Sequence, residues 1–229
     1  LYPLMLGGYF YIMDQDEKLN VHKVKEVVLT NNINFIQATP TYWNLLLSIS
    51  WPVLPSLTAL SGGEALEKSL ALKISKITNH IFNMYGPTET TIWSTIVKLD
   101  EYLKISIGKP LKGTSVMVLN SKREPVPHGE RGELYIAGPG VSKGYINNPE
   151  KNLSSFFKAS DLPFLEGINS SIDTIYKTGD IVSYNGNNLI YHGREDHQVK
   201  INGHRIELND ITRVVESFFS DGNQRAFNF

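Results

Sequence analysis

Cysteine is absent from this chain of 229 residues, which excludes disulfides, cysteine-ligated metals and a thiol nucleophile. The net charge is only -1 and the lysines are spread among acidic residues, so the concentrated basic surface of most nucleic-acid-binding proteins is missing. No run approaches the roughly 18 apolar residues that a membrane-spanning helix needs. The six histidines show no metal-ligand spacing. What remains is a globular protein of one or two domains, expected in the cytoplasm.

The first hundred residues alternate short apolar runs with helical patterns, which is typical of parallel βαβ units. Asn20 is expected to cap one helix, and Pro40 suits the first turn of another. Strands are predicted over 33–37, 57–61 and 80–84, and a further helix over 66–77. Their carboxyl ends would line one edge of a sheet, which is where open α/β folds bind ligands.

From about residue 104 the pattern changes to short strands separated by turns, and Asn185-Gly186 is a strong hairpin signal. These strands are predicted over 115–119, 133–137, 175–178 and 189–192, with a helix and a loop over 149–173 and a further strand at 198–201. We therefore predict an α/β protein with a doubly wound, mostly parallel sheet, followed by a small β-barrel-like subdomain and the start of a C-terminal α+β lid domain. The expected boundaries are 1–103, 104–195 and 196–229.

One segment places an aromatic ring, a tight turn, hydroxyls and a carboxylate directly behind an apolar strand. It reads Asn83-Met84-Tyr85-Gly86-Pro87-Thr88-Glu89-Thr90-Thr91. The strand would deliver Tyr85 to the sheet edge, and Gly86-Pro87 makes the turn. This composition is typical of a nucleotide site. A surface turn that caps the next helix is the alternative, because Thr and Glu are both favoured in a first turn.

A second group of motifs narrows these alternatives. It comprises Tyr176-Lys177-Thr178-Gly179-Asp180, the segment from Gly132 to Gly138, Gly144-Tyr145, and the segments from Tyr191 to Asp196 and from Gln198 to Glu207. In their order along the chain and their rough spacing, the motifs resemble those of adenylate-forming enzymes. The resemblance is closest to the amino-acid adenylation domains of nonribosomal peptide synthetases. The resemblance runs from Leu1 to about Ile211. Several separated motifs are together far more specific than any one of them alone.

The resemblance implies an enzyme that activates an amino acid with ATP as an aminoacyl adenylate. It then passes the acyl group to the phosphopantetheine thiol of a carrier-protein domain, in a synthetase that also carries a condensation domain. The implied cofactors are ATP or AMP and Mg²⁺. The residues implied to bind the nucleotide are Gly63, Asn83, Tyr85, Gly86, Asp180 and Tyr191, with Tyr85 stacked on adenine and Asp180 accepting from the ribose hydroxyls. Those implied in catalysis are Thr88, Glu89 and Arg194, with Glu89 as the Mg²⁺ ligand, and the implied domain hinge is Asp196.

The amino-acid pocket is matched through the same motifs. Its implied positions are Gln37, Leu60, Gly62, Met84, Ile92 and Trp93. Most of these side chains are large, so little room remains for a substrate side chain. The set resembles the glycine-selecting pattern of the family, and we expect glycine as the substrate and alanine as the next best.

Two elements of the family are missing from the sequence. These are the phosphate loop with its lysine, expected upstream of Leu1, and the lysine that contacts the reacting carboxylate, expected downstream of Phe229. We therefore expect a chain truncated at both ends and inactive alone in pyrophosphate exchange. The stretch after Asp221 also departs from the usual small domain. An acyl-CoA or aryl-acid ligase of the same superfamily stays an alternative, as does a non-catalytic nucleotide-binding remnant.

Overall fold

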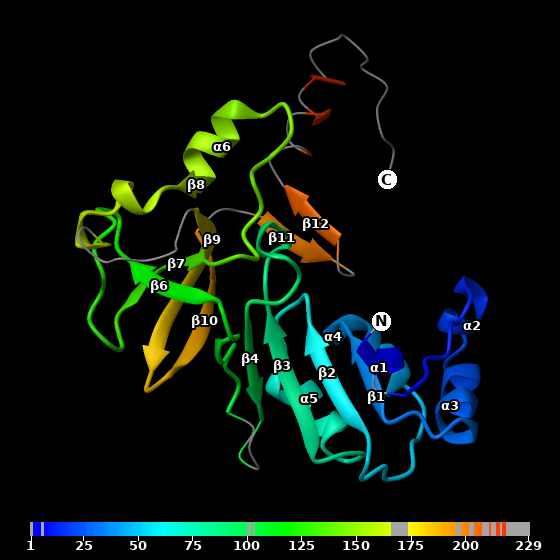
Figure 1. The fold of residues 1–229 in the computed structure, drawn as a ribbon. Coiled ribbons are helices and arrows are strands. Elements are labelled where there is room, and N and C mark those ends of the chain that lie inside the picture. The colour runs from blue at the N-terminus through cyan, green and yellow to red at the C-terminus, as the bar shows by residue number, and fades with distance from the viewer. Residues whose placement is uncertain are drawn as a thin grey trace.

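The computed structural model describes residues 2–5, 7–99, 102, 104–165, 174–195, 198–201 and 204–207, together with 211, 214, 215, 217 and 218. In the described part of the chain, two five-stranded sheets and a two-stranded ribbon follow one another (Figure 1). None of the helices described there is long and apolar enough to cross a membrane. The predicted hinge residue Asp196 lies outside the described residues, as does the stretch from Asp221 to Phe229.

The first sheet has the order β1-β2-β3-β4-β5. Its β1–β2 and β2–β3 pairings are parallel, and β4 and β5 are added antiparallel. The α/β class is therefore confirmed, whereas β4 and β5 had no counterpart among the predicted strands. The strands are β1 (Phe35–Ala38), β2 (Thr58–Gly62), β3 (His80–Tyr85), β4 (Thr95–Lys98) and β5 (Lys109–Pro110).

Two helices of this part begin at residues whose side chains were expected to cap them or to suit their first turn. The Asn20 side chain accepts from the Lys23 N–H at the start of α3, and Thr39 accepts from the Tyr42 N–H at the start of α4, where Pro40 is the first residue. Both predicted helix starts are confirmed. The predicted helix 66–77 is shorter, because α5 covers only Lys68–Ile74. The helices are α1 (Tyr2–Met5), α2 (Gln15–Leu19), α3 (Val21–Thr30), α4 (Pro40–Leu46) and α5.

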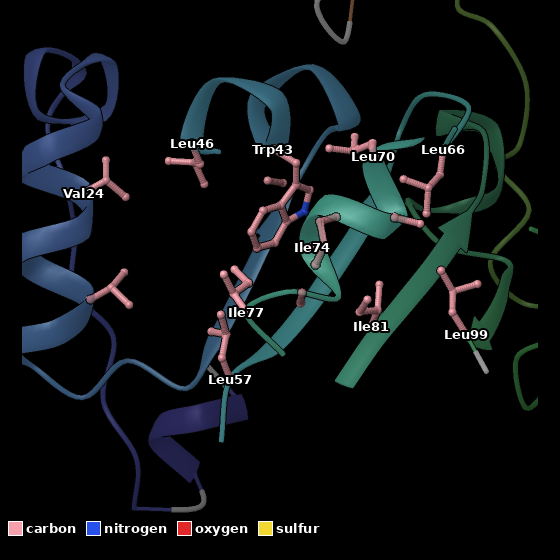
Figure 2. Packing of buried hydrophobic residues seen from close by; sticks show 14 residues of the cluster. Val24, Trp43, Leu46, Leu57, Leu66, Leu70, Ile74, Ile77, Ile81 and Leu99 are labelled. Carbon is pink, nitrogen blue, oxygen red and sulfur yellow. The ribbon is translucent and has the colours of Figure 1, made fainter. Parts of the chain in front are cut away.

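One buried cluster joins these helices to one face of the first sheet. Trp43 of α4 and Ile74 of α5 pack with Ala59 of β2 and Ile81 of β3, and Figure 2 shows the Trp43 ring among its apolar neighbours. The indole N–H of Trp43 donates to the Leu60 carbonyl at 2.9 Å, so the buried polar atom is satisfied. The cluster leaves the opposite face of the sheet to a different set of side chains.

The second sheet is antiparallel, with the order β10-β9-β7-β6 and with β8 paired to β9. The hairpin predicted at Asn185-Gly186 is confirmed, since β9 and β10 pair on either side of it. The elements are β6 (Ser115–Leu119), β7 (Arg131–Ala137), α6 (Pro149–Ser155), β8 (Phe156–Phe157), β9 (Ile175–Asn185) and β10 (Asn188–Arg194); the ribbon is β11 (Gln198–Ile201) with β12 (His204–Glu207). Short 3₁₀ turns cover Thr88–Thr90 (η1), Ala159–Asp161 (η2) and Pro163–Leu165 (η3).

A short segment connects the two sheets. The Ile107 N–H donates to the Leu189 carbonyl, and the Leu189 N–H donates to the Gly108 carbonyl, both at 2.8 Å. Ile107 also belongs to the buried cluster of the second sheet, against which Tyr85 from the first sheet packs. The carboxyl end of β3 therefore lies beside the β9–β10 hairpin. This junction positions the candidate site.

Candidate functional site

A cavity of about 450 Å³ lies where the carboxyl ends of β2 and β3 meet strands β9 and β10. Ligand sites of α/β folds occur at such strand ends. Three segments of the first 107 residues line it, together with three side chains of the second sheet. The lining residues are Gly63, Glu64, Ala65, Leu66, Asn83, Met84, Tyr85, Gly86, Ile105, Ser106, Ile107, Asp180, Tyr191 and Arg194.

Asp180 lies between two hydrogen-bond donors from different parts of the chain. Its Oδ1 pairs with Nη1 of Arg194 at 2.9 Å, and its Oδ2 accepts from the Tyr85 hydroxyl. The side chains of Arg194 and Asp180 are 13% and 7% exposed, so the ion pair is screened little by solvent. Burial, and then the charge of Asp180, raise the pKa of the Tyr85 hydroxyl well above 10.0. At neutral pH Tyr85 is therefore a neutral hydroxyl that donates to Asp180.

The strands present Asp180 and Arg194 through interruptions of the ladder. Glu133 pairs with Ile181 and Tyr135 pairs with Lys177, so three residues of β9 stand opposite the single residue between them on β7. The sequence predicted a short strand that ended before Gly179-Asp180. That prediction is wrong, because β9 continues through both residues as a bulge.

Asn83 and Glu64 anchor the walls that come from the first sheet. Nδ2 of Asn83 donates to the Ser106 carbonyl at 2.7 Å, which fastens the β3 end to the connecting segment. Oε2 of Glu64 accepts from the Thr41 N–H at 2.9 Å and from the Thr41 hydroxyl at 2.7 Å. The loop after β2 is thereby tied to the first turn of α4.

Thr88 and Glu89 lie in η1 and are not among the cavity-lining residues. Glu89 is 6% exposed, and its Oε1 accepts from the Tyr145 hydroxyl at 2.5 Å. In the described part of the chain no group of three or more His, Cys, Asp or Glu side chains could hold a metal ion. A lone carboxylate fits a hard cation such as Mg²⁺ only if phosphate and water supply most of its ligands.

The predicted amino-acid pocket lies on a different surface from the cavity, except for Met84, which lines the cavity. The strand register places Gln37, Leu60, Gly62 and Met84 on one face of the first sheet, opposite the helix-covered face. Nε1 of Trp93 donates to Oε1 of Gln37 at 3.3 Å.

The Trp93 ring fills the space over Gly62. A Cβ on Gly62 would lie 2.4 Å from Cη2 of Trp93, so no side chain fits between them. Ile92 does not contribute to this packing, since it is 63% exposed. The backbone at Thr91 and Ile92 has φ values of 63° and 68°, which is a strained conformation for such residues.

Seven of the predicted nucleotide and catalytic residues line the cavity together: Gly63, Asn83, Tyr85, Gly86, Asp180, Tyr191 and Arg194. Sequence reasoning missed two lining segments. The residues Glu64 to Leu66 directly follow a predicted strand end, so the strand-end argument could have included them. Residues Ile105 to Ile107 follow no such pattern, and only the contact between the two sheets brings them to the cavity.

Comparison with known proteins identifies the family to which the chain belongs. The model of the AMP-binding enzyme family matches residues 1–146. The chain belongs to this family. It is 38% identical over 216 residues to a dimodular nonribosomal peptide synthase of Bacillus subtilis strain 168, covering 93% of this chain and 9% of that protein. The chain therefore spans only a small part of the length of such relatives.

Two solved structures of adenylation proteins resemble this AMP-binding chain. A four-domain nonribosomal peptide synthetase bound to AMP and glycine is 38% identical, with a TM-score of 0.78, over 95% of this chain and 16% of its own. A Vibrio cholerae adenylation domain in complex with glycyl-adenosine-5'-phosphate is 31% identical, with a TM-score of 0.78, over 93% of this chain and 40% of its own. These similarities confirm the predicted family and fold.

Proposed function

We propose that the chain is part of an amino-acid adenylation domain, and that its cavity binds the adenosine portion of ATP and of the aminoacyl adenylate. The observation that carries this proposal is the convergence of Tyr85, Asp180 and Arg194 on one cavity from two different sheets. Tyr85 is one of the lining residues, and we propose that the adenine base stacks on its ring. The neighbouring carboxylate provides acceptors for ribose hydroxyls.

The charges of the cavity suit this ligand. A carboxylate offers about four acceptor sites, and Asp180 can therefore receive hydroxyl protons in addition to its bonds with Arg194 and Tyr85. Hydrogen bonds to a charged group contribute about 1.5–3 kcal/mol each. Arg194 supplies positive charge beside the ribose, where phosphate oxygens of a bound nucleotide also lie within reach of a long side chain.

The proposal includes Glu89 as the protein ligand of Mg²⁺. When bound with ATP, Mg²⁺ would neutralise phosphate charge as pyrophosphate leaves. Glu89 would hold the ion on the protein side, with phosphate oxygens and water completing its ligands. Tyr145 orients the carboxylate through its hydroxyl, and Thr88 at the start of η1 could donate to a phosphate oxygen. The hinge role of Asp196 and the predicted domain boundaries stay predictions.

Glycine is the proposed substrate. The support is the Trp93 ring packed on Gly62, which leaves no room for a substrate side chain above this part of the sheet. Overpacking by added methylenes costs about 1–3 kcal/mol. The two similar solved proteins bind glycine or glycyl adenylate. The thiol acceptor would be the phosphopantetheine of a carrier domain in the same synthetase.

Nucleotide titration tests the proposal directly. We expect the chain to bind AMP in isothermal titration calorimetry, and Asp180→Ala to raise the dissociation constant at least tenfold because the ribose acceptor is lost. The same change should raise the apparent KM for ATP severalfold in the complete synthetase. Asp161→Ala, in the separate 3₁₀ turn η2, is the matched control and should bind AMP as the unchanged chain does. Equal affinity in the Asp180 and Asp161 variants would remove Asp180 from the ribose site.

A further inference from the structure

A buried carboxylate outside the cavity supports the bulge that presents Asp180. Glu133, on β7, is 8% exposed and does not line the cavity. Its Oε1 accepts from the Gly179 N–H at 2.9 Å, and its Oε2 pairs with Nζ of Lys177 at 3.2 Å. One side chain thus contacts β9 on both sides of Thr178.

The contacts of Glu133 replace hydrogen bonds that the bulge removes. The residues from Thr178 to Asp180 stand opposite Leu134 alone, so β7 cannot offer a separate ladder carbonyl to each of their N–H groups. The Thr178 hydroxyl replaces two of the missing partners, because it donates to the Leu134 carbonyl and accepts from the Asp180 N–H. Glu133 supplies the remaining acceptor. Without it a backbone N–H next to Asp180 would lose its partner.

Gly179 is also held from the other side. Its carbonyl accepts from the Glu195 N–H at 2.8 Å, which lies one residue beyond Arg194. Gly179 has φ +76°, a conformation that favours glycine, so the chain turns sharply here. The direction in which Asp180 leaves the strand therefore depends on how both backbone groups of Gly179 are bound.

We propose that Glu133 is a positioning residue for nucleotide binding, and that it acts through the Gly179 N–H to hold Asp180 toward Tyr85 and Arg194. This inference rests on the proposed nucleotide function of the cavity. Lys177 serves as the counter-charge that allows a carboxylate to be buried there. Burial raises the pKa of Glu133 above its ordinary value, although Lys177 and the Gly179 amide act in the opposite direction.

Two conservative variants of Glu133 separate the effect of side-chain length from the effect of its charge. Glu133→Gln keeps the length and an oxygen acceptor for Gly179 but removes the charge. Glu133→Asp keeps the charge but is one methylene shorter, so its oxygens are withdrawn from the Gly179 N–H. Both substitutions are small, and thermal unfolding checks that both variants are folded.

The test combines AMP titration with amide hydrogen exchange of Gly179 measured by NMR. We expect Glu133→Asp to raise the AMP dissociation constant about tenfold and to speed exchange at Gly179, whereas Glu133→Gln should stay within about threefold of the unchanged chain on both. A purely structural role would lower the unfolding temperature without changing the affinity of the folded protein. The inference is overturned if both variants bind AMP as the unchanged chain does, or if the Gln variant is the weaker one. Failure of the unchanged chain to bind AMP would instead overturn the proposed function.

Discussion

The two sheets deliver polar groups to the same cavity in different ways. In the first sheet Asn83 and Tyr85 lie at the end of β3, where the strand ladder stops and the backbone is about to turn. In the second sheet Asp180 lies in the middle of β9, within an 11-residue strand. A strand end leaves few ladder bonds to replace. In the bulge of β9, Glu133 and Thr178 take the place of ladder partners for the Gly179 and Asp180 N–H groups.

This contrast indicates where each half of the site is sensitive to substitution. The first sheet rests on one large apolar cluster with three helices, so its strand ends are fixed by packing. The second sheet holds its functional groups through a polar network of Glu133, Lys177 and Thr178. Changes in packing should therefore act mainly on stability, and changes in the network mainly on ligand binding.

The largest effect is expected at the junction of the two sheets. A Cβ on Gly108 would lie 2.1 Å from the Ile96 carbonyl oxygen, and φ is +82°. Gly108→Ala should destabilise the fold by about 3 kcal/mol, since overpacking costs about 1–3 kcal/mol and a left-handed backbone about 1–2 kcal/mol. Gly129→Ala is the matched control, because Gly129 has φ +91° with nothing within 4 Å of its Cβ. Urea unfolding should show a loss of only about 1 kcal/mol there, and equal losses would show that the junction tolerates the added methyl group.

The next effect concerns the open face of the first sheet. Trp93→Ala should let larger amino acids in, while glycine turnover falls modestly, because the ring that covers Gly62 is removed. Amino-acid-dependent pyrophosphate exchange with glycine, alanine and phenylalanine measures this in the synthetase. Trp51→Ala is the control, since its indole N–H donates to the Leu46 carbonyl elsewhere in the fold. A preference of the unchanged enzyme for phenylalanine over glycine would show that the pocket assignment is wrong.

A smaller effect is expected where the two sheets touch. Tyr85→Phe keeps the ring for stacking but removes the hydroxyl that donates to Asp180. AMP affinity should fall about two- to tenfold, because one net hydrogen bond contributes about 0.5–1.5 kcal/mol. Tyr184→Phe is the control for calorimetry, because it removes a tyrosine hydroxyl from the second sheet at a residue that does not line the cavity. A loss as large as that of Asp180→Ala would mean that the hydroxyl, and not the carboxylate, dominates ribose binding.

The smallest effect is a pH dependence within the second sheet. Burial, and then the charge of Arg131, lower the pKa of His192 below 6.5. As the pH falls below this value, the unfolded chain binds the proton more readily than the folded chain, so this group reduces stability toward acidic pH. His192→Gln should flatten that part of the stability curve in urea titrations between pH 7 and about pH 5. The exposed His22→Gln is the control, and an unchanged slope in the His192 variant would contradict the expectation.

The strand-end half of the site was predictable from the sequence. An apolar run followed by a glycine turn located Asn83 and Tyr85, because periodicity and turn residues act locally, whereas Gly63 came from the family resemblance. The role of Asp180 came from family resemblance, and its place in a continuous strand could not be foreseen. The bulge at Gly179 is bound by Glu133, 46 residues earlier in the chain, and local sequence carries no signal of such a contact. The segment Ile105 to Ile107 was missed for the same reason, since only its contact with Leu189 brings it to the cavity.

A crystal structure of the chain soaked with AMP would test the central proposal most directly. We expect density for the adenine ring against Tyr85 and the loop Gly63 to Leu66, with ribose hydroxyls within hydrogen-bond distance of Asp180 and the phosphate directed toward Arg194. AMP bound at another surface, or a cavity that stays free of nucleotide at saturating AMP, would contradict the assignment of this cavity as the nucleotide site.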